Sequence, residues 1–172
     1  MTLVWQYGSN MDEERINDPD RLKGTAKFVG LAVKRRHKLA FTHTNLDGVG
    51  TADIVEAGIC DYVIGCLYEI PDEMLKQLDK VEGVNSGAYK RVNVDVKRLN
   101  EKFSVVSESL IPISYVVVNK EKRAKTDAEY SNHILQGVIT HRMGRSYFER
   151  IKKIIIKNNP SIQKELLSYS PC

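Results

Sequence analysis

The chain has 172 residues, a length that favours one domain. It carries 26 Lys and Arg against 22 Asp and Glu, and this small net charge of +4 argues against a nucleic-acid partner. No apolar stretch approaches the roughly 20 residues of a membrane-spanning helix, and the first residues lack the pattern of a signal peptide. Cys60, Cys66 and Cys172 are odd in number and have no CxxC spacing, which favours a cytoplasmic protein over a disulfide scaffold.

The first half of the chain reads mainly as strands. Residues 3–7 are β-branched and aromatic and predict a buried strand, and a short helix is expected over residues 11–17. Residues 26–42 predict one long bent strand or two paired strands. Residues 43–53 are rich in turn formers and predict a loop. Residues 62–70 form the clearest strand, in which Gly65 allows a close backbone approach.

The second half moves from strands to helices. Residues 72–82 predict a helix that starts near Pro71 and ends before Gly83. Residues 90–99 and 110–118 predict two more strands, and helical periodicity begins at residue 127. This order predicts an α+β fold with a mixed or antiparallel sheet that curls into a small barrel. We expect one domain, residues 1–172, with the C-terminal helices of residues 127–172 packed on the barrel.

The sequence YGSN at residues 7–10 joins the first strand to the first helix, and two interpretations stay open. Ser9 or Asn10 caps the helix, with acidic residues 12–14 favouring the positive end of its dipole. Alternatively, a turn led by Gly8 exposes backbone N–H groups that hold an anionic ligand. The acidic residues would repel phosphate, so a single carboxylate fits better. Such a turn needs a close approach and a dihedral angle that only glycine allows.

Glu82 occupies an unusual position for a carboxylate. It follows Leu75 and Leu78 on the inward face of the predicted helix, at the negative end of the helix dipole. Burial and the dipole both raise its pKa, which suits a general base that works near neutrality. The alternative is a frayed last turn that leaves Glu82 in water.

Other candidate sites have ordinary explanations. The four histidines (residues 37, 43, 133 and 141) lack zinc-ligand spacing, and no metal site is expected. No motif for a covalent serine or cysteine nucleophile is visible. The basic residues 34–38 fit an exposed strand edge.

The YGSN turn and the downstream sequence LDKVEGVNSGAY together resemble the γ-glutamylcyclotransferase family. The strand YVIGCLYEI and the later ISYVVV follow in the family's order, so the resemblance covers residues 2 to about 150. It implies an α+β fold around a small barrel, a homodimer, and no metal or cofactor. In that family the YGSN loop binds the γ-glutamyl group and the Glu of LDxxEG accepts the proton. These positions correspond to Tyr7, Gly8, Ser9, Asn10 and Glu82.

The resemblance also implies that two further tyrosines line the pocket, and Tyr115 and Tyr130 are the matching residues. Trp5 and Gln6 differ from the residues usual before YGSN. Trp5 is therefore expected to contribute to the substrate-binding wall and to alter the choice of acceptor amino acid.

The reaction implied for the family needs no cofactor. A γ-glutamyl compound carries its own nucleophile, the α-amine, which attacks the γ-carbonyl and releases 5-oxoproline and an amino acid. The expected partner is this small-molecule substrate, with no nucleic acid or membrane. Two alternatives remain: a related cyclotransferase acting on γ-glutamyl-amines, γ-glutamyl-lysine or glutathione, and a non-catalytic γ-glutamyl-binding module.

Overall fold

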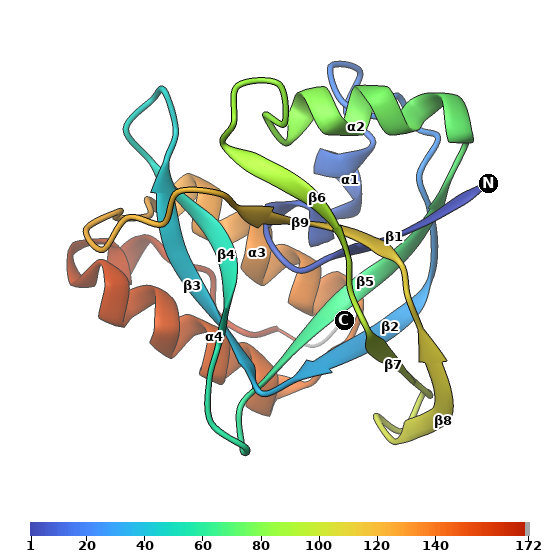
Figure 1. The fold of residues 1–172 in the computed structure, drawn as a ribbon. Coiled ribbons are helices and arrows are strands. Elements are labelled where there is room, and N and C mark those ends of the chain that lie inside the picture. Colours follow the sequence, from blue (N-terminus) through green and yellow to red (C-terminus); the bar gives the residue numbers. More distant parts are fainter. Residues whose placement is uncertain (171–172) are drawn as a thin grey trace.

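The computed structural model describes the backbone of residues 1–170 and their side chains except those of residues 107 and 108. Cys172 lies outside the described residues. The chain forms a seven-stranded sheet, a separate two-stranded sheet and helices that are concentrated in its last third (Figure 1). This arrangement confirms the predicted α+β class.

The elements have the following bounds. The strands are β1 (Thr2–Gln6), β2 (Lys27–Arg35), β3 (His37–Thr44), β4 (Gly50–Glu56), β5 (Tyr62–Ile70), β6 (Tyr89–Asn93), β7 (Val96–Leu99), β8 (Val105–Leu110) and β9 (Ile113–Val117). The α-helices are α1 (Glu13–Ile16), α2 (Leu75–Val81), α3 (Ala128–Thr140) and α4 (Arg145–Asn158). Short 3₁₀ turns cover Ser9–Met11, Asp72–Met74 and Pro160–Glu165.

The large sheet has the order β6-β9-β1-β5-β2-β7-β8 and is mixed, because β1 pairs parallel with β9 and antiparallel with β5. The predicted barrel is not closed. Strands β3 and β4 pair only with each other among the described strands, as a separate sheet on the left of Figure 1. The chain passes from one sheet to the other at Arg36, which adopts a positive φ of 56°. Thus β2 and β3 are successive strands that bend apart rather than a pair.

Several predicted boundaries are wrong. The loop expected over residues 43–53 contains the end of β3 and the first half of β4. The strand expected over residues 90–99 is divided into β6 and β7, and the one over residues 110–118 is divided at Ile111 and Pro112. Proline has no N–H to donate to a sheet, which accounts for the second interruption. The strand of residues 62–70 is confirmed in full as β5.

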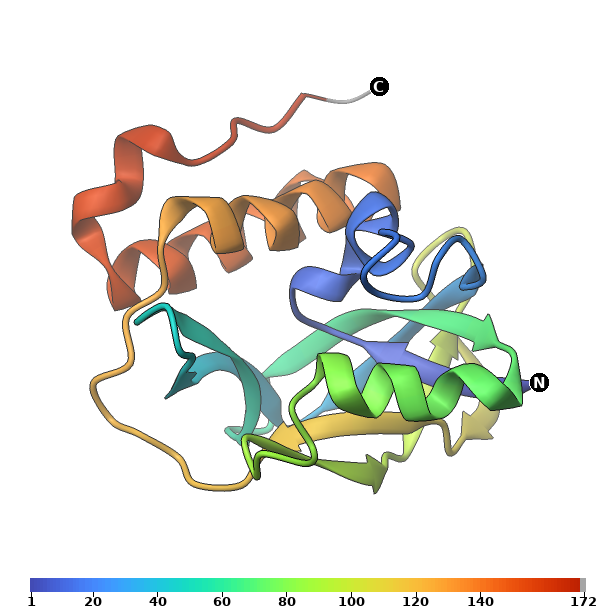
Figure 2. The same ribbon diagram turned by 90° about the horizontal axis from the view of Figure 1, so that it is seen from above.

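Helices α3 and α4 lie side by side on one side of the strands, whereas α2 lies apart from them (Figures 1 and 2). The first turn of the chain is held against α3. A Cβ on Gly137 would come within 2.5 Å of the Met11 Cβ, so only glycine permits this approach. No described helix is long and apolar enough to cross a membrane.

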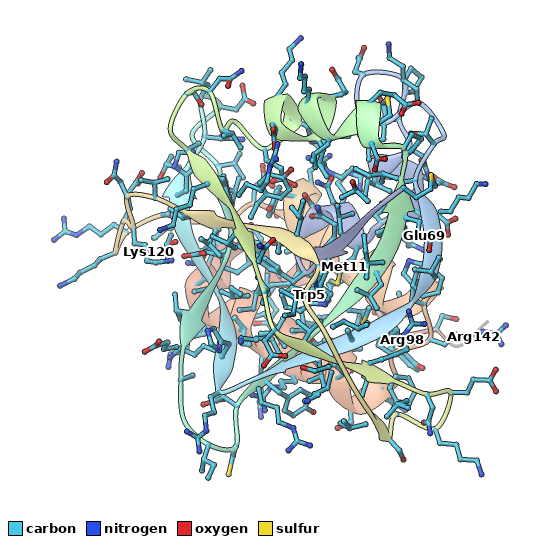
Figure 3. All side chains as sticks on the ribbon, turned by 45° about the vertical axis from the view of Figure 1, so that its right-hand side comes forward. Trp5, Met11, Glu69, Arg98, Lys120 and Arg142 are labelled. Atoms are coloured by element: carbon cyan, nitrogen blue, oxygen red, sulfur yellow. The ribbon has the colours of Figure 1, made fainter. Side chains whose placement is uncertain are left out.

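The core beneath the turn is built around Trp5, which has no exposed surface. Trp5 and Met11 both lie in the interior in Figure 3, whereas Lys120 and Arg142 extend outward. A Cβ on Gly65 would lie 2.6 Å from the indole Nε1, which confirms the expected close approach at this glycine. Trp5 therefore packs against β5 in the core.

Candidate functional site: a partly buried carboxylate beside the first turn

The turn after β1 is fixed by backbone hydrogen bonds. The Met11 N–H donates to the Gly8 carbonyl at 3.0 Å, and the Asp12 N–H donates to the Ser9 carbonyl at 3.2 Å. In the described chain, the N–H groups of Gly8, Ser9 and Asn10 donate to no protein acceptor. Successive backbone N–H groups in a turn form an anion-binding concavity where they point to the same side.

The capping role expected for Ser9 or Asn10 is wrong. Neither side chain caps the 3₁₀ turn, and the N-cap of α1 is Asp12, whose carboxylate accepts the Glu14 N–H at 3.1 Å. Ser9 and Asn10 are nonetheless buried polar residues. Their burial is therefore not explained by capping.

Gly8 is required for space rather than for an unusual dihedral angle. Its φ is −105°, which other residues also adopt, so the predicted special dihedral is wrong. The predicted close approach is confirmed, because an added Cβ would lie 3.0 Å from the Ala52 Cβ and 3.5 Å from the Tyr130 hydroxyl oxygen. Strand β4 and helix α3 thus press on the turn from two sides.

Glu82 is held at the C-cap of α2 by a Schellman motif. The Gly83 N–H donates to the Lys80 carbonyl, the Val84 N–H donates to the Asp79 carbonyl, and Gly83 has a φ of 67°. Glu82 itself donates its N–H to the Leu78 carbonyl at 2.9 Å. The last turn is therefore not frayed, and the backbone of Glu82 is fixed.

The Asn10 side chain holds the carboxylate, and Arg21 holds Asn10. The Asn10 Nδ2 donates to Glu82 Oε1 at 2.8 Å, and the Arg21 guanidinium donates to Asn10 Oδ1 at 2.9 Å. Burial raises the pKa of Glu82 to about 7, although the charge of Arg21 and the hydrogen bond from Asn10 both lower it. The carboxylate can therefore accept or donate a proton near neutral pH.

Glu82 lines two adjoining cavities. The outer cavity has a volume of about 330 Å³ and includes Arg15, Arg21, His43 and Asp47 in its wall. The inner cavity, of about 30 Å³, is formed by Gln6, Tyr7, Gly8, Ser9, Asn10, Ala52, Glu82, Tyr89, Tyr115 and Tyr130. The structure thus brings seven of the eight candidate residues to one small space.

The remaining candidate, Trp5, lies in the wall of neither cavity. Its indole N–H donates to the Ala32 carbonyl at 3.2 Å, and its ring lies 5.4 Å from that of Tyr7. Trp5 therefore lies behind Tyr7, which lines the inner cavity, and does not line the cavity itself.

The tyrosines are anchored through their hydroxyl groups. Tyr7 donates to the Tyr115 carbonyl at 2.5 Å, and Tyr115 donates to Asp79 Oδ1 at 2.8 Å. The Tyr130 hydroxyl accepts the Ala52 N–H at 2.9 Å. Burial raises the pKa of each of these tyrosines, so they remain neutral at physiological pH.

Tyr89, Arg15 and Arg21 are among the residues at the site that sequence reasoning missed. Tyr89 lines both cavities and donates to the Ala52 carbonyl at 2.6 Å. It ends the SGAY sequence, which was the available signal. Arg15 and Arg21 line the outer cavity, and no local pattern distinguishes them from surface arginines.

The histidines take separate positions. His133 bonds to Asp12 at 2.6 Å, and the ring of His141 stacks on Phe28 with centroids 4.1 Å apart. Across residues 1–170, no three histidine, cysteine or acidic side chains are grouped so that they could hold a metal ion.

Comparison with known proteins shows the family to which the chain belongs. The AIG2-like family matches residues 62–151, which contain Glu82. The Bacillus subtilis (strain 168) protein YkqA, whose name assigns it provisionally as a gamma-glutamylcyclotransferase, is 29% identical over 147 residues. That match covers 86% of this chain and 50% of YkqA, so the chain spans about half the length of this curated relative.

Solved structures of similar fold support the same superfamily. A gamma-glutamyl cyclotransferase superposes with a TM-score of 0.72 at 26% identity, covering 88% of this chain and 86% of that one. The Homo sapiens protein loc79017, described as uncharacterized, gives a TM-score of 0.75 at 26% identity, covering 99% and 92%. The chain therefore belongs to the AIG2-like family, within the γ-glutamylcyclotransferase superfamily.

Proposed function

We propose that the protein is a γ-glutamylcyclotransferase that converts γ-glutamyl amino acids or peptides into 5-oxoproline and a free amino acid. The observation that carries this proposal is the Glu82 carboxylate, which is fixed in a cavity wall beside unpaired N–H groups and has a pKa of about 7. The superfamily assignment supports the same reaction class.

The proposed chemistry is an internal displacement. Glu82 takes a proton from the substrate's α-ammonium group, and the free amine attacks the γ-carbonyl carbon to form the ring C–N bond. The tetrahedral intermediate collapses, the original amide C–N bond breaks, and the leaving nitrogen receives a proton from Glu82. Glu82 moves one proton; the attacking nitrogen loses a second proton to solvent on ring closure, and the released amine takes one up from solvent to become an ammonium group. In total, two protons leave the attacking nitrogen and two arrive on the leaving nitrogen. The reaction consumes neither water nor an oxidant.

Most of the rate would come from orientation. Well-placed intramolecular groups reach effective molarities of about 10⁵–10⁸ M, so a site that folds the substrate into attack geometry supplies a large effect. A general base adds roughly 10²–10⁴-fold. The unpaired N–H groups of Gly8, Ser9 and Asn10 are suited to an anion, either the substrate's α-carboxylate or the developing oxyanion.

The alternative of a non-catalytic binding module is less consistent with the site. Retaining a partly buried carboxylate with a raised pKa costs stability. A module that only bound γ-glutamyl groups would be better served by a carboxylate of ordinary pKa, because a carboxyl group with a pKa near 7 is only partly ionised at neutral pH and pairs less well with the substrate's α-ammonium group.

A substrate panel tests the proposal. The purified protein is incubated with a γ-glutamyl α-amino acid, γ-glutamyl-ε-lysine, a γ-glutamyl alkylamine and glutathione, and 5-oxoproline is quantified by chromatography. We expect release of 5-oxoproline from at least one γ-glutamyl α-amino acid. Turnover of the lysine or amine conjugate alone would favour the related cyclotransferase. Binding without turnover of any substrate would establish the non-catalytic alternative.

A further inference from the structure

Two arginines of the outer cavity have no acidic partner. Arg15 lies in α1 and Arg21 in the loop that follows, and both line this cavity. Within residues 1–170 the arginines that form ion pairs are Arg91 and Arg150, so neither cavity arginine has a carboxylate within 4.0 Å. The Arg15 Nε is also buried without a hydrogen-bond partner. Both guanidinium groups therefore keep donors for a ligand.

The two cations lie close enough to repel each other. Burial lowers the pKa of Arg21, and the charge of Arg15 lowers it further, while Glu82 raises it. The other acidic residue of the cavity wall, Asp47, is exposed at its rim. An anionic group bound between the arginines would relieve this repulsion.

The position of the arginines identifies which part of a substrate they would meet. Both line the outer cavity and neither lines the inner one, whereas Glu82 lines both. Among the turn residues with unpaired N–H groups, Gly8 lines only the inner cavity, and Ser9 and Asn10 line both. The γ-glutamyl end of the substrate would therefore lie where the two cavities meet, beside Glu82. The leaving group then extends from Glu82 into the outer cavity.

Arg21 has donors to spare for this role. A guanidinium has five N–H donors in a planar fork, and Arg21 uses one nitrogen to hold the Asn10 amide. The Arg15 guanidinium carbon lies 5.9 Å from the centre of the Tyr130 ring, beside the wall of the inner cavity. A carboxylate needs this kind of paired donor arrangement, and an uncharged alkyl chain does not.

We infer that Arg15 and Arg21 bind the carboxylate of the leaving amino acid, which makes γ-glutamyl α-amino acids the preferred substrates over γ-glutamyl amines. The inference rests on the proposed cyclotransferase function. It assigns the choice of leaving group to two residues outside the YGSN and LDKVEG sequences.

A matched pair of substrates tests this inference. One is a γ-glutamyl α-amino acid with a free carboxylate, and the other is the same compound with that carboxylate converted to a carboxamide. Both share the γ-glutamyl half, so the ratio of their kcat/KM values cancels effects on Glu82. We expect the wild-type protein to prefer the acid by about tenfold or more, because a charge-assisted contact is lost with the amide.

Three variants complete the design. Arg15→Gln and Arg21→Gln should each lower the acid-to-amide ratio toward 1, mainly by raising KM for the acid. Arg15→Lys should keep part of the preference because it keeps the charge. Lys27→Gln is the control, since Lys27 is exposed at the start of β2 and lines neither cavity, and its ratio should match the wild type.

The outcomes separate the inference from the function on which it rests. If the wild-type protein releases 5-oxoproline equally well from the acid and the amide, or if both glutamine variants keep the wild-type ratio, the inference is wrong and the cyclotransferase function stands. If no substrate releases 5-oxoproline, the function itself is wrong and the inference falls with it.

Discussion

The Asn10 amide donates a 2.8 Å hydrogen bond to the Glu82 carboxylate, and so connects the first turn of the chain to the end of α2. The contact joins residues 72 positions apart. Arg21 fixes its direction, because a guanidinium bound to Asn10 Oδ1 obliges the amide nitrogen to face Glu82. Asn10 thus fixes two parts of the site relative to each other. One is the turn that we propose binds the substrate, and the other is the carboxylate that we propose transfers the proton.

This contact predicts the pH dependence of activity. Glu82 must be ionised to accept a proton, so kcat/KM should rise with pH to a plateau, with a midpoint near 7. The Asn10 hydrogen bond stabilises the ionised form, and Asn10→Ala should therefore move the midpoint to higher pH as well as reduce the plateau. A midpoint near 4.5 in the wild-type protein, or one that Asn10→Ala leaves in place, would show that another group controls the rate.

The same raised pKa predicts a pH-dependent gain in stability for Glu82→Gln. The pKa of about 7 in the folded state exceeds the ordinary value of 4.5, so the folded state binds the proton more tightly. Below about pH 4.5 Glu82 is protonated in both the folded and the unfolded state. As the pH rises from about 4.5 to 7, only the unfolded state loses the proton readily, so the free energy of unfolding of the wild type falls. Glutamine avoids this cost.

The difference in melting temperature between Glu82→Gln and the wild type should therefore be more positive at pH 8.5 than at pH 5. Thermal unfolding in matched buffers measures it. A difference that is the same at both pH values would contradict the raised pKa.

Alanine substitutions at Ser9 and at Asp12 should differ in their effect on the free energy of unfolding. Asp12 caps α1 and bonds to His133, so Asp12→Ala should lower the free energy of unfolding by about 1 kcal/mol or more. Ser9 makes no cap, and Ser9→Ala should reduce kcat/KM with a smaller loss of stability. Urea unfolding and steady-state kinetics on both variants test the contrast. Equal losses of stability in the two variants, with kcat/KM per folded molecule unchanged for Ser9→Ala, would show that Ser9 supports the fold and not the reaction.

Gly8→Ala should affect the site more than the fold. The new methyl group would press on Ala52 and on the Tyr130 hydroxyl, both of which line the inner cavity. We expect a higher KM for γ-glutamyl substrates and a smaller effect on melting temperature, because the φ of −105° is not in the left-handed region and the contacts of the new methyl group lie in the cavity wall. A large fall in melting temperature with unchanged kinetics per folded molecule would place the turn outside the substrate site.

The sequence pattern was sufficient to predict the elements whose apolar residues face the core and whose polar residues face solvent. The apolar β1 and β5 and the amphipathic α3 and α4 were predicted from periodicity alone. The start of strand β4 was not, because it lies in the polar, turn-rich residues 43–53 that predicted a loop, and these include Asp53, a fully buried acid. Its partners are Thr42, Lys120 and the Val117 N–H, which come from other segments of the chain.

The site shows the same division. Glu82 was predicted from its conflict with an apolar helix face, and the structure fixes it at the C-cap of α2. Three contacts of the site depend on tertiary packing, which residue spacing along the chain does not predict. They are the bond from Asn10 to Glu82, the bond from Arg21 to Asn10, and the bond from Tyr89 to β4. The homodimer, the cytoplasmic location and the independence from cofactors stay predictions.

The most direct test of the account measures 5-oxoproline release by the wild-type protein and by Glu82→Gln from the same γ-glutamyl α-amino acid at pH 8. Glutamine keeps the shape of the side chain and an acceptor for Asn10, but it cannot take a proton. The account predicts turnover by the wild type and a loss of at least roughly 100-fold in the variant, the effect of removing a general base. Circular dichroism and binding of the γ-glutamyl compound should remain close to wild type. Turnover by folded Glu82→Gln at a rate near that of the wild type would contradict the account.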